Sequence, residues 1–128
     1  MKKMYVAFSH QLTDAQYKDA AVSLKVFNFV YPSADIQKLI SNIPDDMEAR
    51  DVRALAWNVV DEAMENDCDY LFIAGQVELV HYALERIKKN GYIQAINSIT
   101  KRKSVEVEVN GVVTKTSIFE HVRWREII

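Results

Sequence analysis

The stretch that most restricts the fold is "DYLFIAG" at residues 69–75, which holds five apolar residues in succession at positions 70–74. A strand with one solvated face alternates between apolar and polar residues, so a continuous apolar run indicates a strand that is buried on both faces. Such strands are typical of parallel sheets with helices packed on both sides. "MYVAF" at residues 4–8 has the same character and predicts a second strand of this kind.

Helical patterns separate the expected strands. Thr13 and Gln16 have the spacing of a capping box, which predicts that a helix begins at about Asp14. Strands are expected at residues 4–8, 25–31, 69–75 and 92–99, with helices over about 14–24, 33–43, 45–66 and 77–89, the last stopping at Asn90-Gly91. This order predicts one α/β domain over residues 1–128, with a Rossmann-like, mostly parallel sheet flanked by helices.

The C-terminal part of the chain has a different pattern. "SVEVEV" at residues 104–109 alternates with period two, and Asn110-Gly111 is the strongest short signal for a two-residue hairpin turn. The sequence therefore predicts a C-terminal antiparallel β-hairpin in which Val109 lies opposite Val112. Carried back from the turn, this register gives three further pairs: Arg102 with Phe119, Thr100 with His121, and Ser98 with Arg123.

Directly opposed residues share a face of the hairpin. The register thus predicts one polar, basic patch, made of Ser98, Thr100, Arg102, His121 and Arg123. Val122 and Trp124 are expected on the core side, and Arg125, opposite Ile96, is expected to be structural. A β-bulge in either strand would shift this register by one residue.

The composition argues against several classes of protein. The formal net charge is −2, from 16 basic and 18 acidic residues, so a broad surface for a long nucleic acid or a membrane is not expected. With three glycines, the chain has no GxGxxG motif and no P-loop, so no dinucleotide or nucleoside triphosphate cofactor is expected. The three histidines lack metal-ligand spacing, so no metal is expected.

Cysteine usage and the first residues bear on the compartment. Cys68 is alone, so the chain has no intrachain disulfide, and the flanking Asp67 and Asp69 disfavour a thiolate. The apolar run after "MKK" is too short for a signal peptide or a membrane span. We expect a cytoplasmic protein.

Polar side chains follow three of the expected parallel strands. Open α/β sheets bind ligands at the carboxyl ends of their strands, so these residues are the first candidates for a site. They are Ser9, His10 and Gln11 after the first strand, Gly75 and Gln76 after the third, and Ser98, Thr100, Lys101 and Arg102 after the fourth. The lysine and arginine residues favour an anionic ligand such as a phosphate.

Two interpretations of the basic residues stay open at this point. They can form a solvated face or be matched by carboxylates such as Glu120 and Glu126, or they can bind an anion. Ser9 beside His10 is either a loop cap or a catalytic pair.

Three stretches carry a resemblance to a known family: "FSHQLTDAQ", "DYLFIAGQ" and "ITKRKSVEVEVNGVVTKTSIFEHVRWRE". Over nearly its whole length the chain is similar to the small ring nucleases of type III CRISPR systems, which have a CRISPR-associated Rossmann-like fold. The third stretch is the most specific, with its T-K-R step, its Asn-Gly turn and the sequence "SIFEHVRWR". The family more often has an acid after the third-strand glycine, where this chain has Gln76.

The resemblance implies a homodimer that binds a cyclic oligoadenylate, above all cyclic tetra-adenylate. It would linearise the ring without a metal, by attack of the ribose 2′-hydroxyl, and so switch off type III CRISPR signalling. Lys101, Arg102 and Arg123 would stabilise charge, and His10 and His121 would transfer protons. The ring would be bound by Ser9, Gln11, Gly75, Gln76, Ser98 and Thr100. The alternatives are a sensor or sponge that binds the same nucleotide without cutting it, and a module whose basic edge docks an acidic protein.

Overall fold

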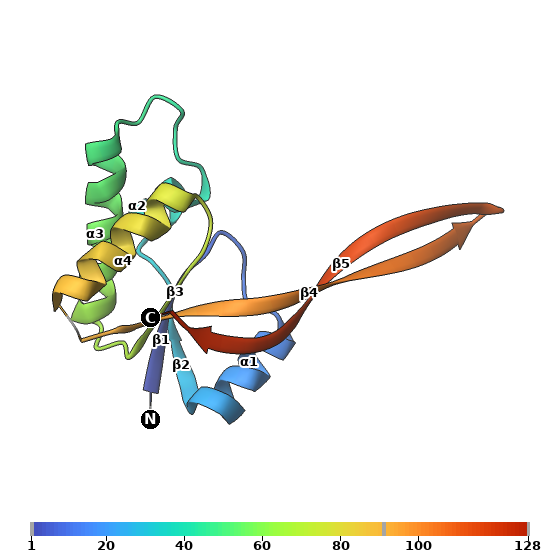
Figure 1. Ribbon diagram of the computed structural model, residues 1–128, viewed down its shortest axis with the longest axis horizontal. Coiled ribbons are helices and arrows are strands. Elements are labelled where there is room, and N and C mark those ends of the chain that lie inside the picture. Colours follow the sequence, from blue (N-terminus) through green and yellow to red (C-terminus); the bar gives the residue numbers. More distant parts are fainter. Residues whose placement is uncertain (1, 91, 128) are drawn as a thin grey trace.

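The computed structural model describes residues 2–90 and 92–127 and has an α/β fold (Figure 1). The strands are β1 Lys2–Ala7, β2 Val26–Val30, β3 Tyr70–Ile73, β4 Gln94–Val109 and β5 Val112–Glu126. The helices are α1 Asp14–Asp19, the π-helical turn η1 Ala20–Leu24, α2 Ala34–Ser41, α3 Ala49–Glu65 and α4 Val77–Asn90. The predicted helix stop at Asn90-Gly91 reaches Gly91, which lies outside the described residues.

The five strands form one sheet in the order β2-β1-β3-β4-β5. Strands β2, β1, β3 and β4 run parallel, and β5 is antiparallel to β4. The chain leaves β1 toward β2 on one side and returns to β3 on the other. The two neighbouring strands β1 and β3 therefore flank a topological switch point, where ligands of such sheets bind. The predicted fold class is confirmed.

The two faces of the sheet are covered by different helices. Alternate residues of β1 divide between the faces, and Met4, Tyr5, Val6 and Ala7 are all at most 1% exposed. On one face, α1 and η1 cover a cluster that includes Met4, Val6, Phe72, Ile96 and Trp124. On the other face, α3 and α4 cover a cluster that includes Tyr5, Ala7, Leu71, Ile73 and Ala95. Residues 4–7 and 70–73, the strand parts of the two apolar runs, are thus buried on both sides, as predicted.

Strands β4 and β5 continue far beyond the other strands as a two-stranded ribbon that projects from the body (Figure 1). We call residues 101–120 the arm. Asn110 and Gly111 at its tip have φ values of 53° and 77°, as a two-residue hairpin turn requires. From Val109↔Val112 back to Thr100↔His121, the pairing follows the predicted register.

A β-bulge at the base of the arm changes this register. Thr100 pairs with His121 but Ile99 pairs with Arg123, so Val122 is the extra residue. The prediction that Ser98 lies opposite Arg123 is wrong, because Ser98 lies opposite Trp124. For the same reason Arg125 lies opposite Asn97 and not opposite Ile96.

The bulge also rearranges the core side of β5. Trp124 is buried, as predicted, but it shares a face with His121, and their ring centroids are 5.0 Å apart. Val122 is 55% exposed, so its predicted place in the core is wrong. Among the described residues, no helix combines the length and the apolar character that a membrane crossing requires.

Candidate functional site

The loops after β1 and β2 enclose a pocket of about 410 Å³ at the carboxyl edge of the sheet. It is lined by Phe8, Ser9, His10, Gln11, Tyr31, Pro32, Ala34 and Gln37. The structure therefore brings together the three residues that were predicted after the first strand. All three are exposed, so their polar groups are accessible to a ligand.

Aromatic packing fixes the start of this loop. The Phe8 ring lies 5.3 Å from that of Phe72 in the core, and the His10 ring stands edge-on to Phe8 at 5.3 Å. Gln37 of α2 donates a hydrogen bond from its Nε2 to the Phe8 carbonyl at 3.1 Å. His10 is thus held at the rim of the pocket by its ring while its nitrogen atoms stay accessible.

Tyr31 forms the opposite wall of the pocket. Its hydroxyl is hydrogen-bonded to that of Tyr17 in α1. Burial and this hydrogen bond raise the pKa of Tyr31 well above its usual value, so the phenol stays neutral. It can donate or accept a hydrogen bond but adds no charge to the pocket.

The loop after β3 begins beside the loop after β1. The Ala74 amide donates to the Ala7 carbonyl at 3.3 Å, which joins the ends of the two strands. Gly75 has φ = +129°, a conformation that side chains disfavour, and the space around its Cα is open. Gly75 and Gln76 are exposed. The switch point thus carries an accessible backbone segment and an exposed amide side chain after β3.

His121 is part of a partly buried chain of hydrogen-bonded polar groups at the base of the arm. Its Nδ1 lies 2.6 Å from Ser98 Oγ, and its Nε2 lies 2.7 Å from Asp19 Oδ2. The His121 side chain is 3% exposed. Gln16 of α1 donates from its Nε2 to Ser98 Oγ at 3.2 Å, and Trp124 Nε1 donates to the Gln16 carbonyl at 3.1 Å. These contacts fasten α1 to the place where the arm leaves the body.

The charge of Asp19 is stabilised in this chain. Burial by itself would raise the pKa of Asp19. Hydrogen bonds from Ser23 and His121, together with the charge of His121, outweigh burial and hold the pKa below its usual value. The group order serine, histidine, aspartate is that of a catalytic triad. However, Ser98 Oγ already accepts from Gln16 and both nitrogen atoms of His121 are engaged, so the geometry favours a positioning role.

The predicted basic patch is divided between two faces. Thr100 and Arg102 share a face with His121, and the Arg102 guanidinium lies 5.9 Å from the Phe119 ring. Arg123 pairs with Ile99 and so lies on the opposite face, as Lys101 does. Ser98, Thr100, Arg102 and His121 are brought together, whereas Arg123 is separated from them by the bulge.

Of the basic residues near the base of the arm, only some form ion pairs with carboxylates. Lys103 and Glu120 form an exposed ion pair at 3.8 Å. Within residues 2–90 and 92–127, Lys101, Arg102 and Arg123 take part in no ion pair. Arg123 instead donates from its Nε to the Trp124 carbonyl at 3.2 Å. Three cations at the carboxyl edge are therefore available to an anion.

Sequence reasoning missed Gln16 and Asp19 as partners of Ser98 and His121. Their three-residue spacing places both on one face of α1. The carboxylate of Asp19 on the inward face of this helix could have indicated a buried polar partner. No pattern in the sequence indicated that Tyr31 and Gln37 line the pocket. No group of three or more histidine, cysteine, aspartate or glutamate side chains in the described part of the chain could hold a metal ion.

Comparison with known proteins gives a family for the chain. It is 34% identical to the uncharacterized protein MJ1673 of Methanocaldococcus jannaschii over 130 residues, which cover 98% of this chain and 97% of that protein. No solved structure matches the chain. The profile of the uncharacterized protein MJ1673 family matches residues 2–125. The chain belongs to the uncharacterized protein MJ1673 family.

Proposed function

We propose that this protein is a metal-independent ring nuclease that binds a cyclic oligoadenylate, above all cyclic tetra-adenylate, and linearises it. In this proposal it acts in the cytoplasm as a homodimer and switches off type III CRISPR signalling, as its resemblance to the CRISPR-associated ring nucleases implies. One observation carries the proposal. The exposed polar loops after β1 and β3 flank the topological switch point, and the base of the arm adds Lys101, Arg102 and Arg123, which take part in no ion pair among the described residues.

The cations and the loops suit a cyclic polyanion. A ring of four adenylates has four phosphates and no free end, so its recognition requires cations and hydrogen-bond donors. Lys101, Arg102 and Arg123 supply the charge from both faces of the arm base. Ser9, Gln11 and Gln76 supply hydrogen bonds from the loops, and Gly75 lets a ligand approach its backbone closely.

The proposed reaction is an internal transfer at phosphorus. The ribose 2′-oxygen forms a bond to the adjacent phosphorus while the bond from phosphorus to the 5′-oxygen breaks. The proton of the 2′-hydroxyl passes to a base, and the leaving 5′-oxygen takes up a proton. The protein must hold the attack in line and stabilise the negative charge of the transition state.

His10 is the better placed of the two candidate histidines for proton transfer. It is exposed at the rim of the pocket, and an imidazole can both donate and accept a proton. His121 is buried between Ser98 and Asp19, so we assign it a positioning role. Lys101, Arg102 and Arg123 then stabilise the charge that develops on the phosphate.

A second candidate is a sensor or sponge that binds the ring without cutting it. The burial of His121 favours this alternative, because it leaves His10 as the one accessible histidine among the two candidates, whereas acid and base catalysis use two proton-transfer groups. The two candidates differ in their products. The purified protein is to be incubated with cyclic tetra-adenylate and a chelator. Linear oligoadenylate is expected, and an intact ring that is bound tightly would favour the second candidate.

A further inference from the structure

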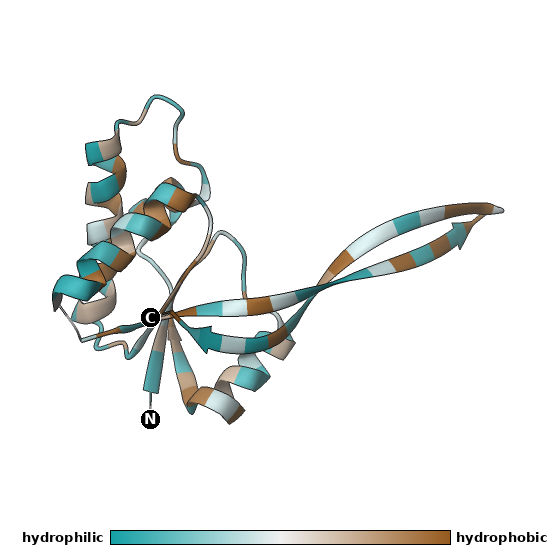
Figure 2. Ribbon diagram, viewed as in Figure 1, coloured by the Kyte–Doolittle hydropathy of each residue, from teal (hydrophilic) through white to brown (hydrophobic). Residues whose placement is uncertain are grey.

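The outer half of the arm has one face without charges. It is formed by Val105, Val107 and Val109 of β4 and by Val112, Thr114, Thr116 and Ile118 of β5. Figure 2 shows hydrophobic and hydrophilic residues alternating along the arm. The exposed fractions are 45% for Val107, 60% for Val109, 63% for Val112 and 46% for Ile118. An isolated two-stranded ribbon is marginally stable in water, and a row of exposed apolar side chains marks an interaction surface.

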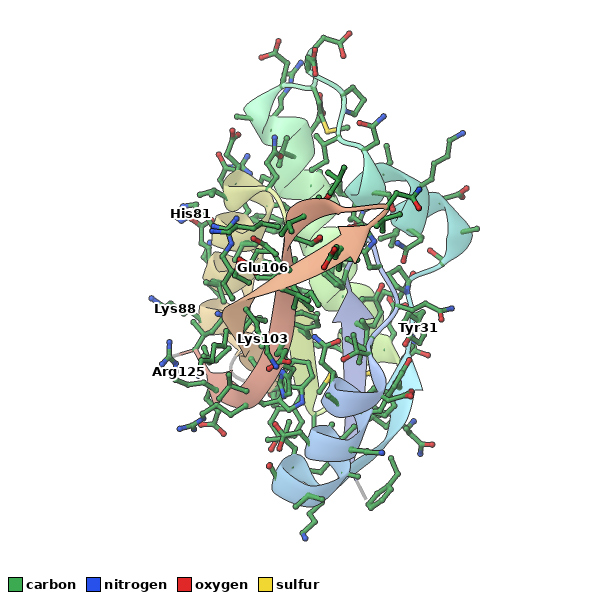
Figure 3. The ribbon with its side chains drawn as sticks, turned by 90° about the vertical axis from the view of Figure 1, so that its right-hand side faces the viewer. Tyr31, His81, Lys88, Lys103, Glu106 and Arg125 are labelled. Atoms are coloured by element: carbon green, nitrogen blue, oxygen red, sulfur yellow. The ribbon has the colours of Figure 1, made fainter. Side chains whose placement is uncertain are left out.

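The same face of β4 leads back to a groove in the body. A groove of about 550 Å³ lies between α4 and the first residues of β4, and its floor is formed by Leu84, Ile87, Ile93, Ala95 and Ile127. Ala95, Val105, Val107 and Val109 are all at odd positions, so the groove floor and the apolar side of the arm belong to one face of the strand. Figure 3 shows His81 and Lys88 of α4 together with Arg125 of β5 on one side of the body, away from Tyr31.

We propose that two copies of the chain form a dimer in which the arm of each copy lies in this groove of the other copy. A strand of nine residues spans about 30 Å, and the arm points away from its own body (Figure 1). The apolar half of the arm therefore cannot reach the groove of its own chain. A surface that contains both the arm and the groove is self-complementary, as a two-fold symmetric dimer requires.

The areas favour this exchange over a contact between two arms alone. The apolar outer half of the ribbon, about 17 Å long on β4 and about 10 Å wide, offers roughly 170 Å² in projection. A stable interface buries about 800 Å² on each partner. In the proposed exchange, each chain contributes two surfaces to the interface, its arm and its groove. The arm of the partner covers the groove between α4 and the first residues of β4. Both apolar surfaces are then buried in one interface.

This inference deepens the homodimer part of the proposed function and rests on that part alone. It does not depend on the identity of the ligand, so it can be tested without any nucleotide. The first test compares two variants that each add one opposed pair of lysines. Val109→Lys with Val112→Lys alters the apolar face, and Ser104→Lys with Ser117→Lys alters the other face. Both carry the same repulsion between opposed lysines within the arm.

The oligomeric state of the full chain is to be measured by size-exclusion chromatography with light scattering. The unaltered chain and the Ser104→Lys/Ser117→Lys variant are expected to be dimers. The Val109→Lys/Val112→Lys variant is expected to dissociate, with a dimer dissociation constant at least about 100-fold higher, because charges would enter an apolar interface. Dimers for both variants, or a monomeric unaltered chain, would overturn the proposal.

Cross-linking tests which surface the arm contacts. Chains with Val112→Cys are to be mixed with chains carrying His81→Cys, at the groove rim, and treated with a short bis-maleimide. Cys68 is 6% exposed, and burial raises its pKa to about 11, so it competes little. A mixed cross-linked dimer is expected. If Val112→Cys chains are joined only to each other, or if a dimeric sample shows no cross-link, the exchange is wrong.

Cleavage of cyclic tetra-adenylate is to be followed in the same samples. A mixed cross-link without ring binding would contradict the proposed function and leave the arm exchange standing. Ring cleavage by a protein that shows no mixed cross-link would contradict the arm exchange and leave the proposed function standing.

Discussion

The Nε2 atom of His121 lies 2.7 Å from Oδ2 of Asp19, although 102 positions separate the two residues in the chain. Ser98 occupies the other ring nitrogen, and the imidazole is 3% exposed. This contact joins the end of α1 to β5 directly beside the bulged Val122. The direction in which the arm leaves the body, and with it the position of Arg102, therefore depends on a partly buried polar contact.

Removal of the Asp19 carboxylate is expected to destabilise the fold. Asp19→Ala leaves a buried ring nitrogen of His121 without its partner, which costs about 1–3 kcal/mol. The free energy of unfolding is to be measured by urea denaturation at neutral pH. Asp45→Ala, at an exposed loop position, serves as the control and is expected to change it by less than about 0.5 kcal/mol. Similar losses in the two variants would show that the contact adds no stability.

The stability of the protein is expected to fall in acid through Asp19 and Glu62. Burial would raise the pKa of Glu62, but hydrogen bonds from the Tyr5 hydroxyl at 2.7 Å and the Ser33 amide at 2.8 Å hold it below its usual value. A carboxyl whose folded pKa is lowered stabilises the fold above its unfolded pKa of about 4. That stabilisation is lost as the pH falls through the folded pKa.

Urea denaturation at several pH values between about 5 and 3 checks this dependence. The unaltered chain should lose stability more steeply than Glu62→Gln or Asp19→Ala, since each variant lacks one of the two titrating carboxyls. If all three proteins show the same slope against pH, these carboxyls do not govern the acid sensitivity.

His10 is expected to contribute to turnover more than to binding. A general acid or base typically contributes about 10²–10⁴-fold to the rate, so His10→Ala should lower kcat by this factor with a change of a few-fold in ring affinity. Single-turnover cleavage and equilibrium binding measure the two quantities separately. Lys18→Ala, at an exposed position of α1, is the control. Equal losses of rate and affinity would make His10 a binding residue.

The cations at the arm base are expected to govern affinity. Lys101→Ala and Arg102→Ala should each weaken ring binding about tenfold or more and reduce its dependence on salt, because in the proposed complex each of these charges faces a phosphate. Binding is to be measured at two salt concentrations by fluorescence anisotropy. Lys115→Ala, in the outer half of the same arm, is expected to bind like the unaltered chain. Equal weakening by Lys115→Ala would point to a diffuse effect of net charge.

The fold could be predicted from the sequence wherever one local rule decided the outcome. Apolar runs at residues 4–8 and 70–74 have few alternatives to buried parallel strands. Asn110 and Gly111 readily adopt the positive φ angles that the hairpin turn requires. Thr13 and Gln16 form the capping box that their spacing predicts. Each of these features depends on a few neighbouring residues.

The arrangement of the site could be predicted only in part, because one extra residue in a strand leaves no local signal. Val122 fits the alternating pattern of a regular strand, so the sequence gave no indication of a bulge that moves Trp124 onto the face of His121. The bulge is consistent with the burial of Trp124 against Phe72, where the rings are 5.1 Å apart. Such a tertiary preference cannot be read from the hairpin alone.

The central claim is that the ribose 2′-hydroxyl opens the ring without a metal. The most direct measurement compares cyclic tetra-adenylate with its 2′-O-methyl analogue in the presence of a chelator, with binding and products followed for both. We expect both rings to bind and the unmodified ring alone to be linearised. Cleavage of the 2′-O-methyl ring at a similar rate, or no cleavage of either ring, would contradict the claim.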